Sequence, residues 1–344
     1  MLMRKVPMGE SLRIIAQGSR NWIAGRPIVV SFEVTDACTC YCRHCDHGGP
    51  RDMSKDMKPA SYKEYMKVLR PVVVQVSGGE PLLRSDLEEV VRNIKSPSGV
   101  PYIILVSNWS TMTVERYKKL REAGVDEFCV SLDFPDAKRH NDFRGLPGHF
   151  EYLEKVIPQA AALGHDDIVL NNCITAWNIE DINANASKAE EWGVNINFSA
   201  YSPRRTGCRD YFPETPEKLA ALDRELAILK KRMNSSHWIT TNNTTLNATR
   251  EYFYSGSAPN CKAGLRWLVV THDGALQPCS MQFKRYGLRE QAKMVKEFTQ
   301  NNTCDQCYVS IRSYLDKSYS QLLKENVAEF FSFKSSHSTN SCAV

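Results

Sequence analysis

The sequence predicts an α/β protein, built as a partial barrel of six parallel strands with a small cysteine-rich domain at its C-terminal end. Through roughly the first 200 residues, short β-rich runs alternate with helix-length amphipathic stretches, which is typical of repeated strand–helix units. The 344 residues allow one large domain or two ordinary ones. Six such units are fewer than the eight of a closed barrel, so we expect an open, TIM-like (β/α)6 barrel.

Each expected strand is a short run rich in β-branched and aromatic residues. The six strands are expected at residues 28–34, 72–76, 102–106, 128–132, 168–174 and 194–199. The helices between them are expected at residues 61–69, 86–94, 114–123, 150–163 and 179–192. In such an arrangement the binding face lies at the carboxyl ends of the strands.

The pattern changes after the sixth strand. Thr215 and Pro216 are suited to the N-cap and first turn of a helix that we expect to run to about Met233, and a polar stretch, 234–249, follows. We place the domain boundary there, before a short apolar strand at 267–270. The expected division is an N-terminal extension (1–27), the barrel (28–209), a helical linker (210–260), the cysteine-rich domain (261–310), and a C-terminal helix and tail (311–344).

Composition excludes several classes of protein. The hydrophobic fraction of 42% with 24% charged residues excludes disordered and fibrous chains. No apolar run is long enough for a transmembrane helix and no signal peptide is evident, so we expect a cytoplasmic protein without an integral membrane segment. The weakly amphipathic, basic segment 12–22 is expected to cap the bottom of the barrel. A net charge of +5 is too small to indicate a nucleic-acid partner.

Twelve cysteines in a chain without an export signal indicate metal or redox chemistry. Seven of them form two groups with chelating spacing: Cys38, Cys42 and Cys45, and then Cys261, Cys279, Cys304 and Cys307. The first group reads C-x3-C-x2-C and can supply three of the four ligands of a [4Fe-4S] cluster, which leaves one iron open. A structural zinc ion is the alternative, although Cys38, Cys40 and Cys42 lie too close together for paired zinc knuckles. We expect the Cys40 side chain to point away from the ligands.

Other polar residues follow the strands and converge on the same face. Gly78-Gly79-Glu80-Pro81 comes after the second strand, Asn108 after the third and Asp133 near the end of the fourth. Glycines allow a ligand to approach the backbone closely, and a carboxylate can orient an ammonium group. The candidate pocket residues are Gln75, Asn108, Asp133, Asn171, Asn197 and Tyr201. Arg204 and Arg205 either meet an anionic substrate or face water.

The cysteine motif and the Gly-Gly-Glu-Pro segment together resemble the radical S-adenosylmethionine (radical SAM) enzymes over residues 28 to about 199. The resemblance implies that the open iron chelates S-adenosylmethionine (SAM) and that an electron from the cluster cleaves its C–S bond to a 5'-deoxyadenosyl radical. It also implies roles for individual residues. The cluster ligands would be Cys38, Cys42 and Cys45, and the cofactor-binding residues would be Gly78, Gly79 and Glu80 for the methionine amino group, Ser131 and Arg144 for its carboxylate, and Asn108. The sequence departs from the family pattern at Thr39, where Asn is frequent, and at Asn141, where Asp is expected.

The second cysteine group resembles the auxiliary-cluster domain called twitch, or the first half of a SPASM domain. Cys261 and Cys279 are separated by 17 residues, and Cys304 and Cys307 form a C-x2-C pair. Only Cys342 follows, so we expect one auxiliary [4Fe-4S] cluster rather than two. Four thiolates complete its coordination, which favours electron transfer over substrate binding. A zinc ribbon remains the alternative. Cys208 is expected to be a passive thiol.

We therefore expect a radical SAM oxidoreductase that abstracts hydrogen from a carbon of a small molecule, while the auxiliary cluster accepts an electron. The alternatives are a maturase that cross-links or modifies a ribosomal peptide and a zinc-stabilised binding protein. Only 37 residues precede Cys38, too few for the peptide-recognition domain of many peptide-modifying relatives, which favours the small molecule. The expected partner is a reductant such as flavodoxin or ferredoxin.

Overall fold

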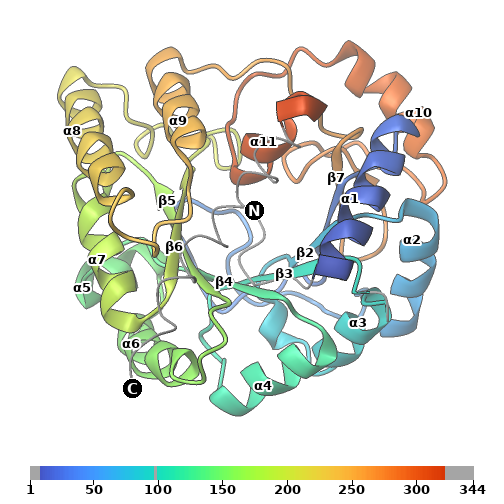
Figure 1. Ribbon diagram of the computed structural model, residues 1–344, viewed down its shortest axis with the longest axis horizontal. Coiled ribbons are helices and arrows are strands. Elements are labelled where there is room, and N and C mark those ends of the chain that lie inside the picture. The colour runs from blue at the N-terminus through green and yellow to red at the C-terminus, as the bar shows by residue number, and fades with distance from the viewer. Residues whose placement is uncertain (1–7, 97–98, 322–344) are drawn as a thin grey trace, which may run out of the picture.

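A computed structural model describes residues 8–96 and 99–321 and contains one eight-stranded sheet in the order β6-β5-β4-β3-β2-β1-β7-β8 (Figure 1). The first seven strands of the chain pair in parallel, and only β8 is antiparallel to its neighbour. The strands are β1 Val29–Glu33, β2 Val73–Ser77, β3 Tyr102–Ser107, β4 Glu127–Ser131, β5 Ile168–Ile174, β6 Asn195–Ala200, β7 Trp267–Val270 and β8 Leu276–Gln277. The predicted six-stranded partial barrel is confirmed, with each strand within one residue of its expected position.

Helices cover the outer side of this curved sheet, as Figure 1 shows. The α-helices are α1 Met8–Ile23, α2 Tyr62–Leu69, α3 Leu87–Ile94, α4 Val114–Ala123, α5 Ala137–Arg144, α6 His149–Ala161, α7 Ile182–Trp192, α8 Pro216–Arg232, α9 Asn243–Ser255, α10 Gln291–Glu297 and α11 Ser310–Leu315. Valine, isoleucine and leucine of the central strands are buried against the inner faces of these helices in one large core. Strands buried on both faces are typical of parallel sheets, and they explain why the strand positions were readable from the sequence.

The cysteine-rich C-terminal region is joined to the barrel through the sheet itself. Val29 on β1 pairs with Val73 of β2 on one side and with Trp267 of β7 on the other. The predicted strand 267–270 is therefore present, and it extends the barrel sheet by one strand. The expected domain division of this region stays a prediction, and residues 322–344, including Cys342, lie outside the described residues, as do residues 1–7.

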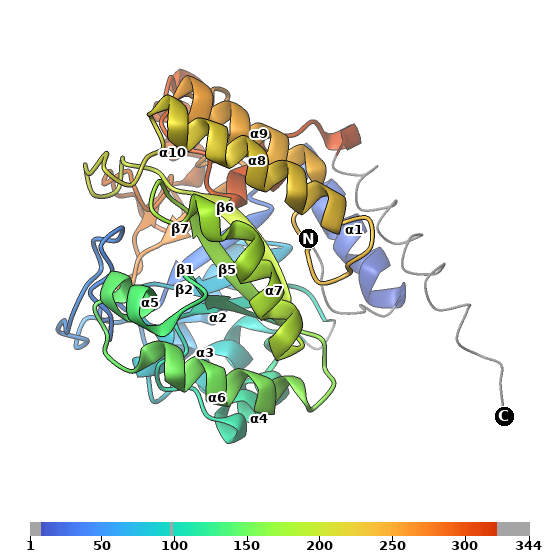
Figure 2. The same cartoon turned by 90° about the vertical axis from the view of Figure 1, so that its left-hand side faces the viewer.

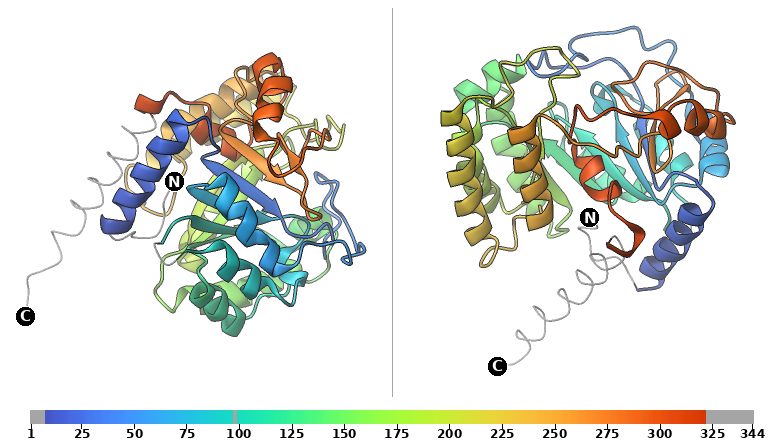
Figure 3. Two further views of the ribbon diagram at one scale, coloured as in Figure 1. Left: turned by 90° about the vertical axis from the view of Figure 1, so that its right-hand side faces the viewer. Right: turned by 90° about the horizontal axis from the view of Figure 1, so that it is seen from above.

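The expected helical linker (210–260) contains a second helix, which begins in the stretch expected to be polar. Helix α9 runs side by side with α8, as two views show (Figure 2, Figure 3). The side chain of Asn242 accepts a hydrogen bond from the backbone N–H of Thr245, which is an N-cap contact. Leu246 and Phe253 of α9 are buried. The asparagine and threonine residues that suggested a loop are thus the cap and first turn of a helix with an apolar face.

Helix α1 lies at the amino ends of the first two strands, as expected for the segment 12–22. The side-chain amide of Asn21 donates to the carbonyl oxygens of Pro27 (2.8 Å) and Arg70 (2.7 Å), which lie shortly before β1 and β2. Arg266, just before β7, places its guanidinium carbon 3.5 Å from the ring centroid of Trp22. Among the residues that the structure describes, no helix is both long and apolar enough to cross a membrane.

Candidate functional site

The loop that carries the first three cysteines follows β1 and is fixed by backbone hydrogen bonds. The N–H of Cys38 donates to the carbonyl of Gly49 (2.9 Å), and Gly49 donates back to Cys40 (3.1 Å), which closes the loop at its base. The N–H groups of Tyr41 and Arg43 donate to the carbonyls of Arg144 (2.9 Å) and Phe143 (3.0 Å), respectively. Because these acceptors end α5, this unpredicted helix sets the position of the loop.

Gly78 and Gly79 lie directly against the start of the cysteine loop. A β-carbon on Gly79 would lie 2.2 Å from the carbonyl oxygen of Ala37, and one on Gly78 would lie 2.3 Å from that of Thr35. The N–H of Gly79 donates to Thr35 (2.8 Å). The φ of +133° at Gly78 also excludes ordinary side chains. Glycine is therefore required here by the approach of two backbone segments.

Glu80 turns its side chain into the protein. Its carboxylate is fully buried and accepts hydrogen bonds from the Ser107 hydroxyl (2.6 Å), the Asn108 N–H (2.7 Å) and the Leu82 N–H (3.0 Å). Burial raises the pKa of Glu80, although these donors oppose the shift. The carboxylate thus ties β3 to the turn after β2, and the predicted contact of Glu80 with a ligand ammonium group receives no support from this arrangement.

Cys40 does not point away from the other cysteines, contrary to our expectation. Its thiol is buried, and its backbone N–H donates to Cys38 Sγ at 3.5 Å. The neighbouring Cys40 thiol is the largest cause that lowers the pKa of Cys38, to about 7, and the pKa of Cys42. The side-chain amide of Asn108 lies 3.2 Å from Cys40 Sγ and 3.8 Å from Cys38 Sγ. The expectation was wrong because the side-chain amide of Asn108, directly after β3, gives the Cys40 sulfur a hydrogen-bond partner inside the protein.

Arg144 lies between the cysteine loop and the end of β4. Its Nε donates to Asp133 Oδ2 (2.6 Å) and its Nη1 lies 3.5 Å from Cys42 Sγ. Burial acts to lower the pKa of Arg144, but Asp133 and the neighbouring thiols raise it overall, so the guanidinium stays charged. Ser131, its predicted partner, is the last residue of β4 and is partly buried. The structure therefore brings Arg144 to the cysteine loop.

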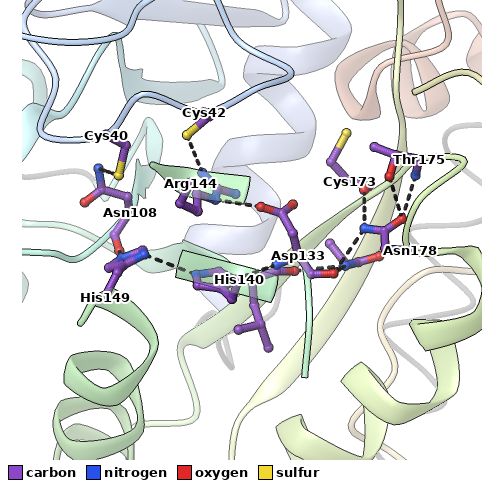
Figure 4. A network of polar contacts seen from close by, with 12 residues as sticks. Cys40, Cys42, Asn108, Asp133, His140, Arg144, His149, Cys173, Thr175 and Asn178 are labelled. Atoms are coloured by element: carbon purple, nitrogen blue, oxygen red, sulfur yellow. Dashed lines mark hydrogen bonds and ion pairs between the residues drawn. The ribbon is translucent and has the colours of Figure 1, made fainter. Parts of the chain in front are cut away.

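Two histidines that the sequence did not single out join this site (Figure 4). His140 on α5 and His149 at the start of α6 are buried and stacked, with 3.1 Å between His140 Nε2 and His149 Nδ1. His140 Nδ1 faces the N–H of Asp133 (3.3 Å), and His149 Nε2 faces the carbonyl of Asn108 (2.7 Å). The sequence offered one signal only, since His140 lies four residues before the predicted site residue Arg144.

The remaining pocket predictions have mixed outcomes. The hydroxyl of Tyr201 binds within the protein and not a ligand, since it donates to the carbonyl of Cys208 (2.8 Å). The side-chain oxygen of Asn197 is buried, and within the described part of the chain it has no hydrogen-bond partner. Gln75 and Asn171 are only partly buried on β2 and β5. None of the six predicted pocket residues lines the cavity beside the cysteine loop.

That cavity, of about 740 Å³, opens beside the cysteine loop between α5 and the start of α8. Its walls combine aromatic and charged side chains: Arg43, Phe134, Arg139, Asp142, Phe143, Ala176, Trp177, Arg209, Asp210, Phe212, Glu214, Thr215 and Lys218. Arg43 lies over the exposed ring of Trp177, 5.6 Å from the ring centroid. A volume of this size fits an ordinary small ligand.

A buried arginine lies beside two members of the second cysteine group, Cys261 and Cys307. Cys261, Cys279 and Cys307 are buried, and Cys304 is partly exposed. Arg312 on α11 is 1% exposed; it donates to the carbonyls of Cys307 and Pro259 and pairs with Asp316 at 2.6 Å. Its Nη1 also lies 3.9 Å from Cys307 Sγ. Sequence reasoning missed this arginine because a cation in a short helix is usually exposed.

Two contacts join the C-terminal region to the first cysteine loop. Arg205, in the loop after β6, pairs with Asp46 and donates to the hydroxyl of Ser280, so it is not simply directed to water. His272, in the turn after β7, lies 2.8 Å from Asp56 and 3.1 Å from Asp36. Arg204 contacts the side chain of Gln306 between Cys304 and Cys307. The loop after β6 therefore touches both cysteine regions.

The candidate metal ligands of both groups are cysteine thiols, which are the preferred ligands of iron–sulfur clusters. Within residues 8–96 and 99–321, no three His, Cys, Asp or Glu side chains form a group that could hold a single metal ion. The described cysteines form no disulfide. Asp133 Oδ1 is buried and has no partner in the described chain, so it can accept a hydrogen bond from a ligand bound beside Arg144.

Comparison with known proteins agrees with this site. The sequence model of the radical SAM superfamily matches residues 32–189. An AdoMet-dependent heme synthase from Methanosarcina barkeri is 24% identical over 273 residues, which cover 74% of this chain and 76% of the relative. A probable GTP 3',8-cyclase from Methanococcus aeolicus is 26% identical over 260 residues, covering 73% of this chain and 84% of that protein.

A solved structure has the same fold. The crystal structure of Streptococcus suis SuiB bound to S-adenosylmethionine aligns with a TM-score of 0.60 and 16% identity over 88% of this chain and 72% of SuiB. SuiB bound to its precursor peptide SuiA aligns with a TM-score of 0.59 and 16% identity over 81% of this chain and 66% of SuiB. The family uses a [4Fe-4S] cluster and SAM, and the C-terminal cysteines are consistent with an auxiliary cluster. Residues 32–189 of the chain match the radical SAM superfamily and form a radical SAM domain.

Proposed function

We propose that the protein is a radical SAM oxidoreductase that acts on a small molecule, with an auxiliary cluster as electron acceptor. One observation carries the proposal: a three-cysteine loop is held against a glycine pair at the mouth of the barrel, while four further cysteines lie in the C-terminal region that β7 joins to the barrel sheet. When bound, the first cluster and SAM supply a 5'-deoxyadenosyl radical that abstracts a hydrogen atom.

The residues of the first site divide the work of holding these groups. Cys38, Cys42 and Cys45 would ligate three irons. Gly78 and Gly79 would present backbone groups to the methionine amino group, because no side chain stands between them and the loop. Glu80 would fix this turn through Ser107 and Asn108 rather than touch the ligand.

Arg144 would bind the methionine carboxylate. Asp133 occupies its Nε, and a guanidinium has further N–H groups that can donate in a fork to a carboxylate. Ser131 at the neighbouring strand end would add a hydroxyl, and Asn108 would line the same face. The Asp133 ion pair keeps the guanidinium charged and oriented before a ligand arrives.

The second group would bind the auxiliary cluster through Cys261, Cys279, Cys304 and Cys307. Buried Arg312 places positive charge beside these thiols, which lowers the cost of holding several thiolates in an apolar region. This group lies across Arg205 from the first loop, so an electron released from a substrate radical has a nearby acceptor.

The cavity beside Trp177 supports a small-molecule substrate over a macromolecular one. Its volume of about 740 Å³ lies within the usual range for small ligands. Arg43 belongs to the cysteine loop and also lines this cavity, so a ligand there would contact the loop directly. The relative SuiB, which binds a precursor peptide, keeps peptide modification as the second candidate.

Anaerobic reconstitution of the full chain tests this function. We expect about eight irons per chain, release of 5'-deoxyadenosine from SAM with dithionite, and loss of that release in Cys42→Ala. Cys129→Ala, a buried cysteine on β4 outside both groups, is the matched control and should keep both properties. Bound zinc without sulfide, or about four irons, would contradict the two-cluster proposal.

A further inference from the structure

We propose that His140 and His149 are positioning residues that, as neutral imidazoles of one fixed tautomer, hold the ends of β3 and β4 so that Asn108 and Arg144 donate to the sulfurs of the first cysteine loop. The inference rests on the proposed role of Cys38 and Cys42 as cluster ligands. Figure 4 shows the chain of contacts from Cys40 through the two histidines to Cys42.

The two histidines connect β3 and β4 beyond the point where the backbone pairing of these strands ends. The β3–β4 ladder ends at Ser107 and Val130. Beyond it, His149 Nε2 lies 2.7 Å from the carbonyl of Asn108, and His140 Nδ1 lies 3.3 Å from the N–H of Asp133. The imidazole pair therefore bridges the two backbones just past their last pairing.

The groups at the two ends of this bridge determine which nitrogen of each imidazole carries its proton. The backbone N–H of Asp133 can only donate, so His140 Nδ1 must accept and its proton must sit on Nε2. That Nε2–H donates to His149 Nδ1, which leaves the second proton on His149 Nε2. This proton in turn donates to the carbonyl of Asn108, which can only accept.

Burial maintains the neutral form of both rings. His140 is fully buried and His149 is 2% exposed. Burial is the largest cause that lowers the pKa of His149 to about 4 and that of His140 well below its usual value, and the charge of Arg144 adds to both shifts. A proton added to either ring would leave two donors facing each other or facing the Asp133 N–H. His44, which also faces this group, is buried as well, and its pKa falls to about 4.

Both ends of the bridge reach the cysteine loop. At one end the side-chain amide of Asn108 approaches Cys40 (3.2 Å), Cys38 (3.8 Å) and the Thr39 hydroxyl (2.9 Å). At the other end Asp133 holds Arg144, whose Nη1 is 3.5 Å from Cys42 Sγ. A shift of either backbone would therefore move an N–H donor relative to a sulfur.

Donors aimed at ligand sulfurs stabilise the added negative charge of a reduced cluster and raise its potential. Residues one step removed from a metal ligand typically change metal affinity or activity by about 10- to 100-fold. A purely structural pair of histidines would change stability without changing the potential of the cluster. The potential is thus the property that separates the two roles.

The first experiment compares reconstituted full-length variants by redox titration followed by electron paramagnetic resonance. We expect His149→Phe and His140→Phe to shift the potential of the first cluster to more negative values and to slow dithionite-driven cleavage of SAM by about 10-fold or more. His149→Gln offers an amide N–H toward the Asn108 carbonyl and should restore part of the shift. His237→Phe is the matched control, because the His237 ring lies against Trp238, far along the chain from these contacts.

The second experiment reads the tautomers directly from the ring nitrogen shifts of wild-type protein labelled with 15N-histidine, and it does not depend on any variant folding. Nε2–H signals for both rings support the inference, and an imidazolium or an Nδ1–H form at either ring overturns it. An unchanged potential in folded, iron-loaded His149→Phe and His140→Phe also overturns it. Absence of iron from the wild-type protein would instead refute the proposed function, while the tautomer result would still stand.

Discussion

Arg205 donates a hydrogen bond of 3.4 Å to the hydroxyl of Ser280 and thereby spans the gap between the two cysteine groups. The same guanidinium pairs with Asp46, the residue after Cys45, whereas Ser280 follows Cys279. The side chain of Arg205 is only 21% exposed. One side chain of the loop after β6 therefore contacts a neighbour of a cysteine in each group, and it holds the C-terminal region against the barrel.

Replacing this arginine should loosen the C-terminal segment that it contacts. In Arg205→Met we expect amide hydrogen exchange at residues 276–282 to accelerate about fivefold, because an ion pair of this exposure contributes about 1 kcal/mol. Exchange measured by mass spectrometry checks this expectation. Arg209→Met removes an exposed arginine from the same loop and should leave the segment unchanged. Equal exchange in both variants would show that Arg205 does not hold the two regions together.

Gly79→Ala tests the close approach of the glycine pair to the cysteine loop. The added β-carbon would lie 2.2 Å from the carbonyl oxygen of Ala37, so one backbone segment must move. We expect a loss of about 1–3 kcal/mol in the free energy of unfolding, together with poor incorporation of iron.

The control for that variant is Gly9→Ala on α1, where a β-carbon meets nothing within 4 Å. Gly9 lies in the first turn of α1 and alanine has a higher helix propensity than glycine, so this variant should be as stable as the wild type or slightly more stable. Denaturant unfolding followed by circular dichroism compares the two. Normal iron content in a stable Gly79→Ala protein would rule out the proposed constraint.

The barrel was predictable because its signals are local. In the strand Ile168–Ile174 five of the seven residues are buried, and its bounds in the structure agree with those expected from the sequence. Helix α5, by contrast, was not predicted, because its eight residues are largely polar and its buried members are His140, Phe143 and Arg144. Its polar residues are buried by contacts with the cysteine loop, which no local pattern reveals.

For the site, too, the sequence predicted the local features and not the tertiary contacts. Spacing alone grouped the seven cysteines, since chelating motifs are short in sequence. The surroundings of these groups come from distant segments: Cys40 meets Asn108, 68 residues further along the chain, and Arg312 meets Pro259, 53 residues before it. The inward position of Cys40 and the buried state of Arg312 depend on which segments the fold brings together. Tertiary contacts of that kind have no signature at the level of spacing.

Arg312→Met should destabilise the C-terminal region strongly. The substitution leaves Asp316 without its charged partner and two carbonyl oxygens without a donor in a buried setting. Removal of one member of a buried ion pair typically costs about 3–5 kcal/mol. Arg289→Met, at a side chain 79% exposed, is the control and should change stability by less than about 0.5 kcal/mol. Thermal unfolding of both variants measures the difference, and similar midpoints would contradict the structural role of Arg312.

Alanine substitutions at the two cysteine groups should separate the cleavage of SAM from the binding of the auxiliary irons. Cys307→Ala is expected to lower the iron content by about four atoms while SAM is still cleaved, because the first loop is intact. Cys45→Ala is expected to abolish cleavage while the auxiliary irons remain. Iron analysis and chromatography of 5'-deoxyadenosine measure both properties on the same preparations. Loss of cleavage in Cys307→Ala with a full first cluster would mean that the groups do not act separately.

Glu33, the last residue of β1, should make the folded protein less stable as the pH rises from about 4.5 to 7. Burial raises the pKa of Glu33 to about 7; Arg205 opposes the shift, and Asp36 and Asp46 add to it. In this interval the folded chain binds a proton that the unfolded chain has released, so the stabilising contribution is complete below pH 4.5 and is lost as the pH passes 7. A shift of this size corresponds to roughly 3 kcal/mol.

The variant Glu33→Gln tests this expectation. It carries no such proton, so its free energy of unfolding relative to the wild type should increase between pH 5 and pH 8 in denaturant titrations. Glu115→Gln, at a side chain 70% exposed on α4, should show no such trend, and a parallel pH dependence for Glu33→Gln and the wild type would sink the assignment.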